Sequence, residues 1–220
     1  MLKKLAALLL IAPFPLAHGE TAVSGIELRP SLGDAPGAVF QGWLSPHQQA
    51  GEEEDVPRLT PKQFKSTTPS TDRADRPSRG HGTLTFNRDF SKAYAHVKLE
   101  GVKLDEINMF HIHCGRPGQL GPIIVDFGMG RDLIEEFADG EVFFEIDNHD
   151  IVAVTEHGHG LVGALTAGCP IVPSIPNDKV KTIAGMANIA FQRELYFNLH
   201  TTSQTYFGDV RGQLHLVSAD

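Results

Sequence analysis

The sequence has little that would suit a nucleic-acid or membrane protein. Its 19 Lys and Arg are outnumbered by 27 Asp and Glu, which gives a net charge of −8. This acidic balance argues against nucleic acid and anionic lipid surfaces as partners. Beyond the first residues, no apolar run is long enough to span a bilayer. No Ser/His/Asp order, phosphate-binding loop or nucleotide-binding fingerprint stands out.

The chain begins with a pattern typical of a secretory signal peptide. A basic start at residues 3–4 precedes an apolar run over residues 5–14, which is too short to cross a membrane. Small residues follow at 17–19, so we expect cleavage after Gly19 and export to the periplasm or beyond. A buried N-terminal helix or an uncleaved anchor is the alternative. Without residues 1–19, which hold two Lys and no acid, 17 basic residues face 27 acidic ones, a net charge of −10.

The sequence has only two cysteines, Cys114 and Cys169. In an exported protein we expect them to form a disulfide. This bridge would close a loop of about 55 residues, which is worth roughly 4 kcal/mol if the stabilisation is entropic. The rival interpretation is a thiolate metal ligand at Cys114, which adjoins His113. Neighbouring strand residues point to opposite faces, however, and this favours the disulfide.

The His-Ile-His sequence at 111–113 is the first pointer to chemistry. Residues 105–113 are typical of a strand, in which His111 and His113 would share a face roughly 7 Å apart along the backbone. Two imidazoles at this spacing can bind one metal ion at about 2.0–2.1 Å from each ring nitrogen. The alternative is two polar residues on a solvated strand face. The Gly- and Pro-rich residues 115–122 predict a sharp turn after the strand.

The N-terminal third is expected to contribute little regular structure. Residues 20–29 suggest a first strand. Residues 30–80 hold seven prolines, the acidic run 52–55 and a polar tract at 66–72, so we predict a long irregular insertion there. Residues 39–44 are the exception and should pack on the core. We interpret the acidic run as solvated, with a cation site as a remote alternative.

From Gly80 onward, short apolar stretches separated by turns predict one β-rich domain, since 220 residues suffice for a single substantial core. Strands are expected at 81–87, 93–99, 105–113, 121–127, 141–146, 194–200 and 209–216. Residues 128–140 predict a loop with one helical turn, and residues 150–176 are ambiguous. The one clear helix is expected at 178–193, with Asn177 as its N-cap. This order predicts an all-β fold, an antiparallel β-sandwich with one short helix.

A second polar row is predicted on the strand 194–200. Tyr196, Asn198 and His200 share one face, opposite three apolar residues. If this row lies beside His111 and His113, three imidazoles meet, and such a set suits copper or zinc better than magnesium or calcium. An open position on the ion would permit redox or Lewis-acid chemistry. Alternatively, His200 bonds a backbone carbonyl and fixes the hairpin.

Three blocks of sequence resemble the chordin-like (CHRD) domain family. They are Gly82-Thr-Leu-Thr-Phe-Asn with Val97-Lys-Leu-Glu-Gly101, His111-Ile-His-Cys-Gly with Gly121-Pro-Ile-Ile-Val, and Leu195-Tyr-Phe-Asn-Leu-His-Thr201 with Gly208-Asp-Val-Arg-Gly-Gln213. The resemblance covers about residues 80–217. It departs from the family pattern in the long insertion, at Phe207 and at Asp209. The family is better known as a fold than as an activity, and it occurs in multidomain extracellular proteins.

The His-x-His strand also resembles the copper-binding strand of copper-zinc superoxide dismutases, which are exported Greek-key β-sandwiches in many bacteria. On that resemblance, His111 and His113 correspond to two copper ligands, and His200 is the candidate for a third.

Other parts of the dismutase pattern are weaker. The zinc loop has no convincing counterpart, and His157 and His159 are the only candidates for additional ligands; a surface loop is the simpler interpretation. Arg211 lies where an anion-guiding arginine would sit. A structural role, in an ion pair with Asp209 or Asp126, is the favoured alternative.

Three functions follow from these patterns. The first is an exported protein that binds copper, or less favourably zinc, for copper handling or redox chemistry, with enzymatic activity left open. The second is a non-catalytic extracellular interaction module without metal, which has a protein partner in the periplasm or outside the cell. The third is a superoxide dismutase, although a charge of −10 would give superoxide no general attraction.

Overall fold

The computed structural model describes residues 27–157, 166–171 and 178–219. The expected signal peptide and residues 20–26 of the expected first strand lie outside these ranges. Residues 27–29 are described and are not part of a strand. The elements from β1 onward belong to one unit, Ser31–Asp220. Within the described ranges, no helix is long and apolar enough to cross a bilayer.

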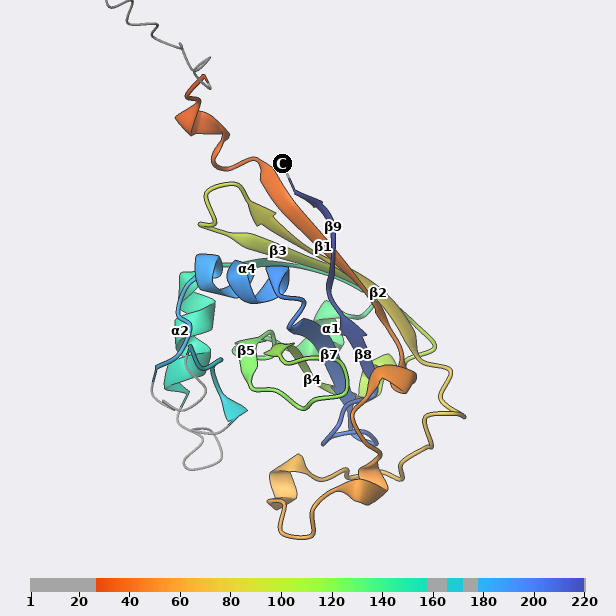
Figure 1. Ribbon diagram of the computed structural model, residues 1–220. Helices are drawn as coiled ribbons and strands as arrows, with labels where there is room; N and C mark the ends of the chain where they lie inside the picture. Colours follow the sequence, from red (N-terminus) through yellow and green to blue (C-terminus); the bar gives the residue numbers. More distant parts are fainter. Residues whose placement is uncertain (1–26, 158–165, 172–177, 220) are drawn as a thin grey trace, which may run out of the picture. The chain divides into compact units, whose positions relative to one another are not determined.

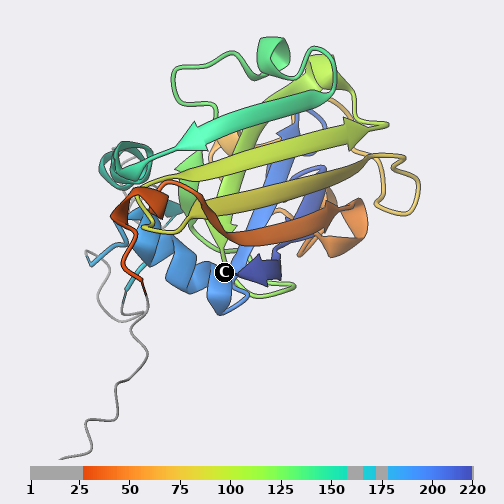
Figure 2. The ribbon, with the colours of Figure 1, turned by 90° about the horizontal axis from the view of Figure 1, so that it is seen from above.

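Two antiparallel sheets pack face to face, which confirms the predicted all-β sandwich (Figure 1). One sheet has the strand order β6-β3-β2-β1-β9, seen face-on in Figure 2, and the other has the order β5-β4-β7-β8. The strands are β1 Pro36–Leu44, β2 Arg79–Asn87, β3 Ala93–Glu100, β4 Ile107–Cys114, β5 Ile123–Asp126, β6 Glu141–Ile146, β7 Leu195–Thr201, β8 Val210–Gln213 and β9 His215–Ala219. Alternate side chains, among them Phe40, Leu84, Phe110 and Phe197, fill the space between the sheets and are fully buried.

The described ranges contain three α-helices rather than the one predicted: α1 Leu133–Glu136, α2 Asn148–Glu156 and α4 Ile183–Phe191. Helix α1 is the predicted helical turn. Helix α2 lies partly in the stretch that the sequence left ambiguous, and Asp147 caps its first N–H groups. The predicted start of the last helix is wrong, because Thr182 is the N-cap of α4 and accepts from the Gly185 N–H. Asn177 lies outside the described residues.

The strand β1 lies inside the segment predicted to be irregular. Residues 39–44 pack on the core as expected, with Phe40 and Leu44 buried, and the strand begins at Pro36 and pairs with both β2 and β9. The irregular part is therefore 45–78. It carries short 3-10 helices at Pro46–Gln48, Glu53–Asp55 and Lys62–Phe64; two others lie at Pro30–Leu32 and Leu104–Glu106.

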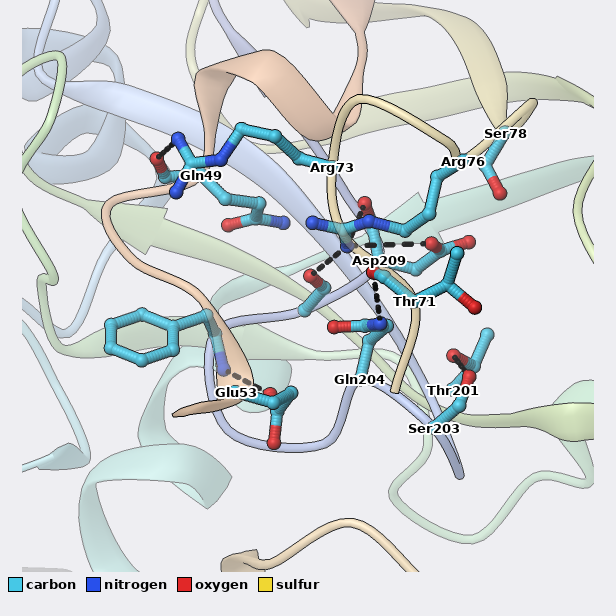
Figure 3. Close-up of polar contacts among 12 residues, drawn as sticks. Gln49, Glu53, Thr71, Arg73, Arg76, Ser78, Thr201, Ser203, Gln204 and Asp209 are labelled. Carbon is cyan, nitrogen blue, oxygen red and sulfur yellow. Dashed lines mark hydrogen bonds and ion pairs between the residues drawn. The ribbon is translucent and has the colours of Figure 1, made fainter. Parts of the chain in front are cut away.

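The prediction that the acidic run 52–55 is solvated is wrong for its first two residues, whose carboxylates have protein partners. The Glu52 carboxylate pairs with Arg73 and, at 3.1 Å, with Arg76. The Glu53 carboxylate accepts the backbone N–H groups of Tyr206 at 2.9 Å and Phe207 at 3.1 Å. The contacts of Glu53 fasten the irregular segment 45–78 to the turn between β7 and β8. Figure 3 shows Glu53 at this turn and Arg76 beside Asp209.

The predicted strand 209–216 is two strands in different sheets. Strand β8 pairs with β7, whereas β9 pairs with β1. Leu214 lies between them, is fully buried, and donates its N–H to the Leu195 carbonyl oxygen at 2.9 Å. The chain therefore crosses from one layer of the sandwich to the other at this residue.

Candidate metal site

The site lies on the pair β4 and β7 in the four-stranded sheet. Their register places Met109 opposite His200, His111 opposite Asn198, and His113 opposite Tyr196. The alternate residues of both strands, such as Phe110 and Phe197, face the core. The polar row therefore occupies the other face of this sheet.

Three histidines come together on that face, as predicted. The ring centroids lie 5.2 Å apart for His111 and His113, 5.2 Å for His111 and His200, and 6.3 Å for His113 and His200. One ring nitrogen from each residue lies within 4.8 Å of the other two. The side chains are buried, with exposures of 3%, 8% and 4% for residues 111, 113 and 200. The alternative of a solvated strand face is therefore wrong.

Hydrogen bonds fix the orientation of two of the rings. Nδ1 of His113 lies 2.8 Å from the Gly121 carbonyl oxygen, and Nδ1 of His200 lies 2.9 Å from that of Thr205. Because a carbonyl oxygen only accepts, both Nδ1 atoms carry the proton and both Nε2 atoms present a lone pair. Donation of the other ring N–H to a carbonyl is the usual support for a metal-binding histidine. The alternative role of His200, a hydrogen bond to a backbone carbonyl oxygen, is therefore present together with the histidine cluster.

Two of the ring nitrogens have no hydrogen-bond partner. They are His111 Nδ1 and His113 Nε2, both fully buried. The Nε2 of His200 accepts from the Asn198 side-chain amide at 3.1 Å. A buried polar atom without a partner costs about 1–3 kcal/mol, and a water or an ion in contact with these atoms would remove that cost. A metal ion accepts lone pairs and fits this need.

The environment keeps all three imidazoles neutral. Burial lowers the pKa of His113 to about 3 and that of His200 to about 4. Burial, with the neighbouring histidines second, also holds the pKa of His111 well below 6.5. Neutral imidazole is the form that binds metals, so at neutral pH no proton has to leave before an ion binds.

A pocket of about 340 Å³ opens onto the three rings. Its walls are largely apolar and come from segments far apart in the sequence; they include Pro61, Phe64, Met109, Leu120, Pro122, Ile123 and Tyr206. The described residues that line it include no Lys, Arg, Asp or Glu. Phe64 belongs to the irregular segment 45–78, so that segment supplies one wall of the site.

Gly121 connects the histidine cluster to the strand β7. Its carbonyl holds His113, and its N–H donates to the Tyr196 hydroxyl at 3.0 Å. The Tyr196 ring stacks on the His113 ring with centroids 5.0 Å apart and planes 7° apart. A Cβ added at Gly121 would lie 1.6 Å from the Cys114 carbonyl oxygen, so only glycine fits.

Arg211 is structural, but not in the predicted way. Its guanidinium donates to the carbonyl oxygens of Gln119 at 2.6 Å and Arg116 at 2.8 Å, and it lies 3.5 Å from the centre of the Tyr196 ring. It forms no ion pair with Asp209 or Asp126. Asp209 pairs with Arg76 at 3.6 Å, and Asp126 lies 3.6 Å from His111 Nε2. Arg211 therefore fixes the loop 115–122 and does not line the pocket.

The remaining predictions have mixed outcomes. Cys114 and Cys169 form the expected disulfide, with Cα atoms 6.1 Å apart, and this excludes a thiolate ligand in this form of the protein. His157 is exposed at the end of α2 and is not part of the cluster. His159 lies outside the described residues.

The sequence interpretation missed Met109, Gly121 and Asp126. Met109 could have been found from the strand alternation, because it precedes His111 by two residues and so shares its face. The contacts of Gly121 and Asp126 depend on how the loop and β5 fold back on β4, which no local pattern specifies.

The fold and the site together define a disulfide-containing β-sandwich: two antiparallel sheets with a buried three-histidine cluster on the face of one sheet that points away from the other. The CHRD domain family matches residues 58–214, which is more than half of the chain, and the protein belongs to this family. No curated protein and no solved structure matches. The resemblance to the dismutase copper strand therefore stays a prediction.

Proposed function

We propose that this CHRD protein binds one copper ion through His111, His113 and His200 and serves copper handling or redox chemistry outside the cytoplasm. The observation that carries the proposal is the pair of buried ring nitrogens without partners, His111 Nδ1 and His113 Nε2, in a cluster that His200 completes. A bound ion that accepts lone pairs from both atoms would remove the cost of their burial.

Copper is favoured over zinc by the general order of affinities. For sites of nitrogen ligands, Cu²⁺ binds more tightly than Zn²⁺. Export is supported by the signal-peptide pattern of residues 1–19 and by the disulfide, since disulfides persist in oxidising compartments.

The test is a metal titration of the purified full chain after treatment with a chelator. Wild type is expected to bind one copper per chain, the count for a single three-imidazole site. The double variant His111→Ala/His113→Ala should lose that uptake. His149→Ala and His157→Ala are the matched controls, because both side chains are exposed on α2 or at its end. Undiminished uptake by the double variant, with wild-type folding by circular dichroism, rules the proposal out.

The alternative is a non-catalytic interaction module whose histidines are structural. It predicts no copper uptake and no change of unfolding temperature when a chelator is added. The same titration therefore separates the two functions.

A superoxide dismutase has less support. The pocket presents no cationic side chain among its described lining residues, and the guanidinium of Arg211 is engaged by carbonyl groups of the loop 115–122. Superoxide would thus lack the charge that steers an anion to a site. A superoxide assay on the copper-loaded protein decides this point.

A further inference from the structure

Met109 is a soft metal donor in the wall of the histidine pocket. It lies on β4 two residues before His111 and directly opposite His200 on β7, so its side chain shares the face of the cluster. Directly opposed residues in an antiparallel pair have Cβ atoms about 4.5–5.5 Å apart. Met109 is half-buried and lines the same pocket as the three rings.

The strand is irregular immediately before Met109. Ile107 pairs with Thr201 and Met109 with His200, so β4 carries one extra residue, Asn108, at this point. Such bulges bend a strand and re-aim the side chains beside functional sites. The Asn108 amide donates to the Thr205 hydroxyl at 3.2 Å, and the Thr205 carbonyl is the group that holds His200. The bulge is therefore tied to the same turn that orients the third histidine.

The thioether is the soft ligand available to the site. Both cysteines are joined in the disulfide, which removes their thiolates from consideration. Three imidazoles leave one position of a tetrahedral ion open. Thioether sulfur selects Cu(I), whereas imidazole alone serves Zn and both copper states. Pro61, Phe64 and Leu120 already form an apolar wall. Apolar packing alone therefore does not require a thioether at this position.

We propose that Met109 Sδ is the fourth ligand of a Cu(I) ion held by His111, His113 and His200. The site would then bind copper preferentially in its reduced state. This rests on the proposed copper binding and specifies its oxidation state. The site would discriminate Cu(I) from Zn²⁺ through Met109 alone, because the imidazoles serve both ions.

The first test compares Cu(I) affinities of the full chain by competition with a Cu(I)-specific chelator under anaerobic conditions. Ascorbate, rather than a thiol, keeps the copper reduced so that the disulfide stays closed. Met109→Leu preserves volume and apolarity, and it should weaken Cu(I) binding by about tenfold or more, the lower range for loss of a contact at a metal site. The affinity for Zn²⁺ should change by less than about twofold, since zinc sites in proteins use Cys, His and carboxylate ligands and not a thioether. Met129→Leu, which lies outside the pocket lining, is the control and should match wild type.

The second test is X-ray absorption of the Cu(I)-loaded protein. We expect one sulfur scatterer beside the imidazole nitrogens in wild type and its loss in Met109→Leu. A nitrogen-only shell in wild type, or an unchanged Cu(I) affinity in Met109→Leu, overturns the inference while copper binding stands. Absence of any copper uptake by wild type overturns the proposed function and this inference together.

Discussion

His113 donates its Nδ1 proton to the carbonyl oxygen of Gly121 at 2.8 Å, across the turn that follows β4. This one bond selects the tautomer of His113 and leaves a lone pair on its Nε2. The residue that supplies the carbonyl has no room for a side chain, so the turn and the histidine are coupled.

Gly121→Ala should therefore weaken copper binding without touching a ligand. The new Cβ would meet the Cys114 carbonyl oxygen at 1.6 Å, so the loop has to move and release His113. Loss of such supporting bonds costs about 10–100-fold in metal affinity, measured by competition with a chelator. Gly118→Ala is the control: it lies in the same loop, and its φ of 77° disfavours alanine, but nothing lies within 4 Å of the added Cβ. Equal affinities in the two variants would contradict the coupling.

His111→Leu should stabilise the metal-free protein while abolishing metal binding. His111 Nδ1 is buried without a partner, and a leucine of similar size removes that cost. The free energy of unfolding, measured by denaturant in the presence of EDTA, should rise by about 1–3 kcal/mol. A fall in stability would show that the contact between His111 Nε2 and Asp126, 3.6 Å away, outweighs that cost.

The metal-free protein should lose stability as the pH falls below 6.5. The folded pKa values of His113 and His200 are about 3 and 4, below the ordinary value of 6.5, so the unfolded chain binds more protons between these limits. The stabilisation is complete above pH 6.5 and declines toward the folded values. Each histidine should cost about 2 kcal/mol between pH 6.5 and pH 5.

This pH dependence is measured by denaturant unfolding at several pH values with EDTA present. Because three buried histidines contribute, His111→Leu should reduce the slope by about a third. An unchanged slope would mean that the carboxylates, not the cluster, govern stability in this range.

Glu53→Ala should loosen the segment 45–78. The carboxylate accepts two backbone N–H groups, from Tyr206 and Phe207, and the Ser66 hydroxyl at 2.7 Å. Hydrogen bonds to a charged group are worth about 1.5–3 kcal/mol, so limited proteolysis within this segment should accelerate. Glu54→Ala is the control, because that carboxylate is exposed and accepts from the Ser70 hydroxyl at 2.8 Å, within the same segment. Identical cleavage rates would remove the role assigned to Glu53.

The parts of the fold that depend on alternation were predictable. Strand alternation places His111 and His113 on one face of their strand, and Tyr196, Asn198 and His200 on one face of theirs. Side chains alternate along a strand whichever strands pair with it. That β4 and β7 are neighbours could only be supposed, and the register that brings the rings together comes from long-range pairing.

The failures lie where tertiary contacts decide. The stretch 209–216 reads as one continuous strand, and nothing local indicates that Leu214 carries the chain into the other sheet. Arg211 would have been expected to find an acid, yet loop carbonyls satisfy it instead. Likewise the carboxylates of Glu52 and Glu53 find buried partners because the segment 45–78 folds back on the sandwich.

The pairing of β4 with β7 has a consequence for when the site can exist. About 85 residues separate the His111 pair from His200, and chains are synthesised at roughly 5–20 residues per second. For several seconds a growing chain thus holds two imidazoles and no third, without the strand that buries them. Binding of an ion by all three imidazoles therefore has to wait until the polypeptide is nearly complete.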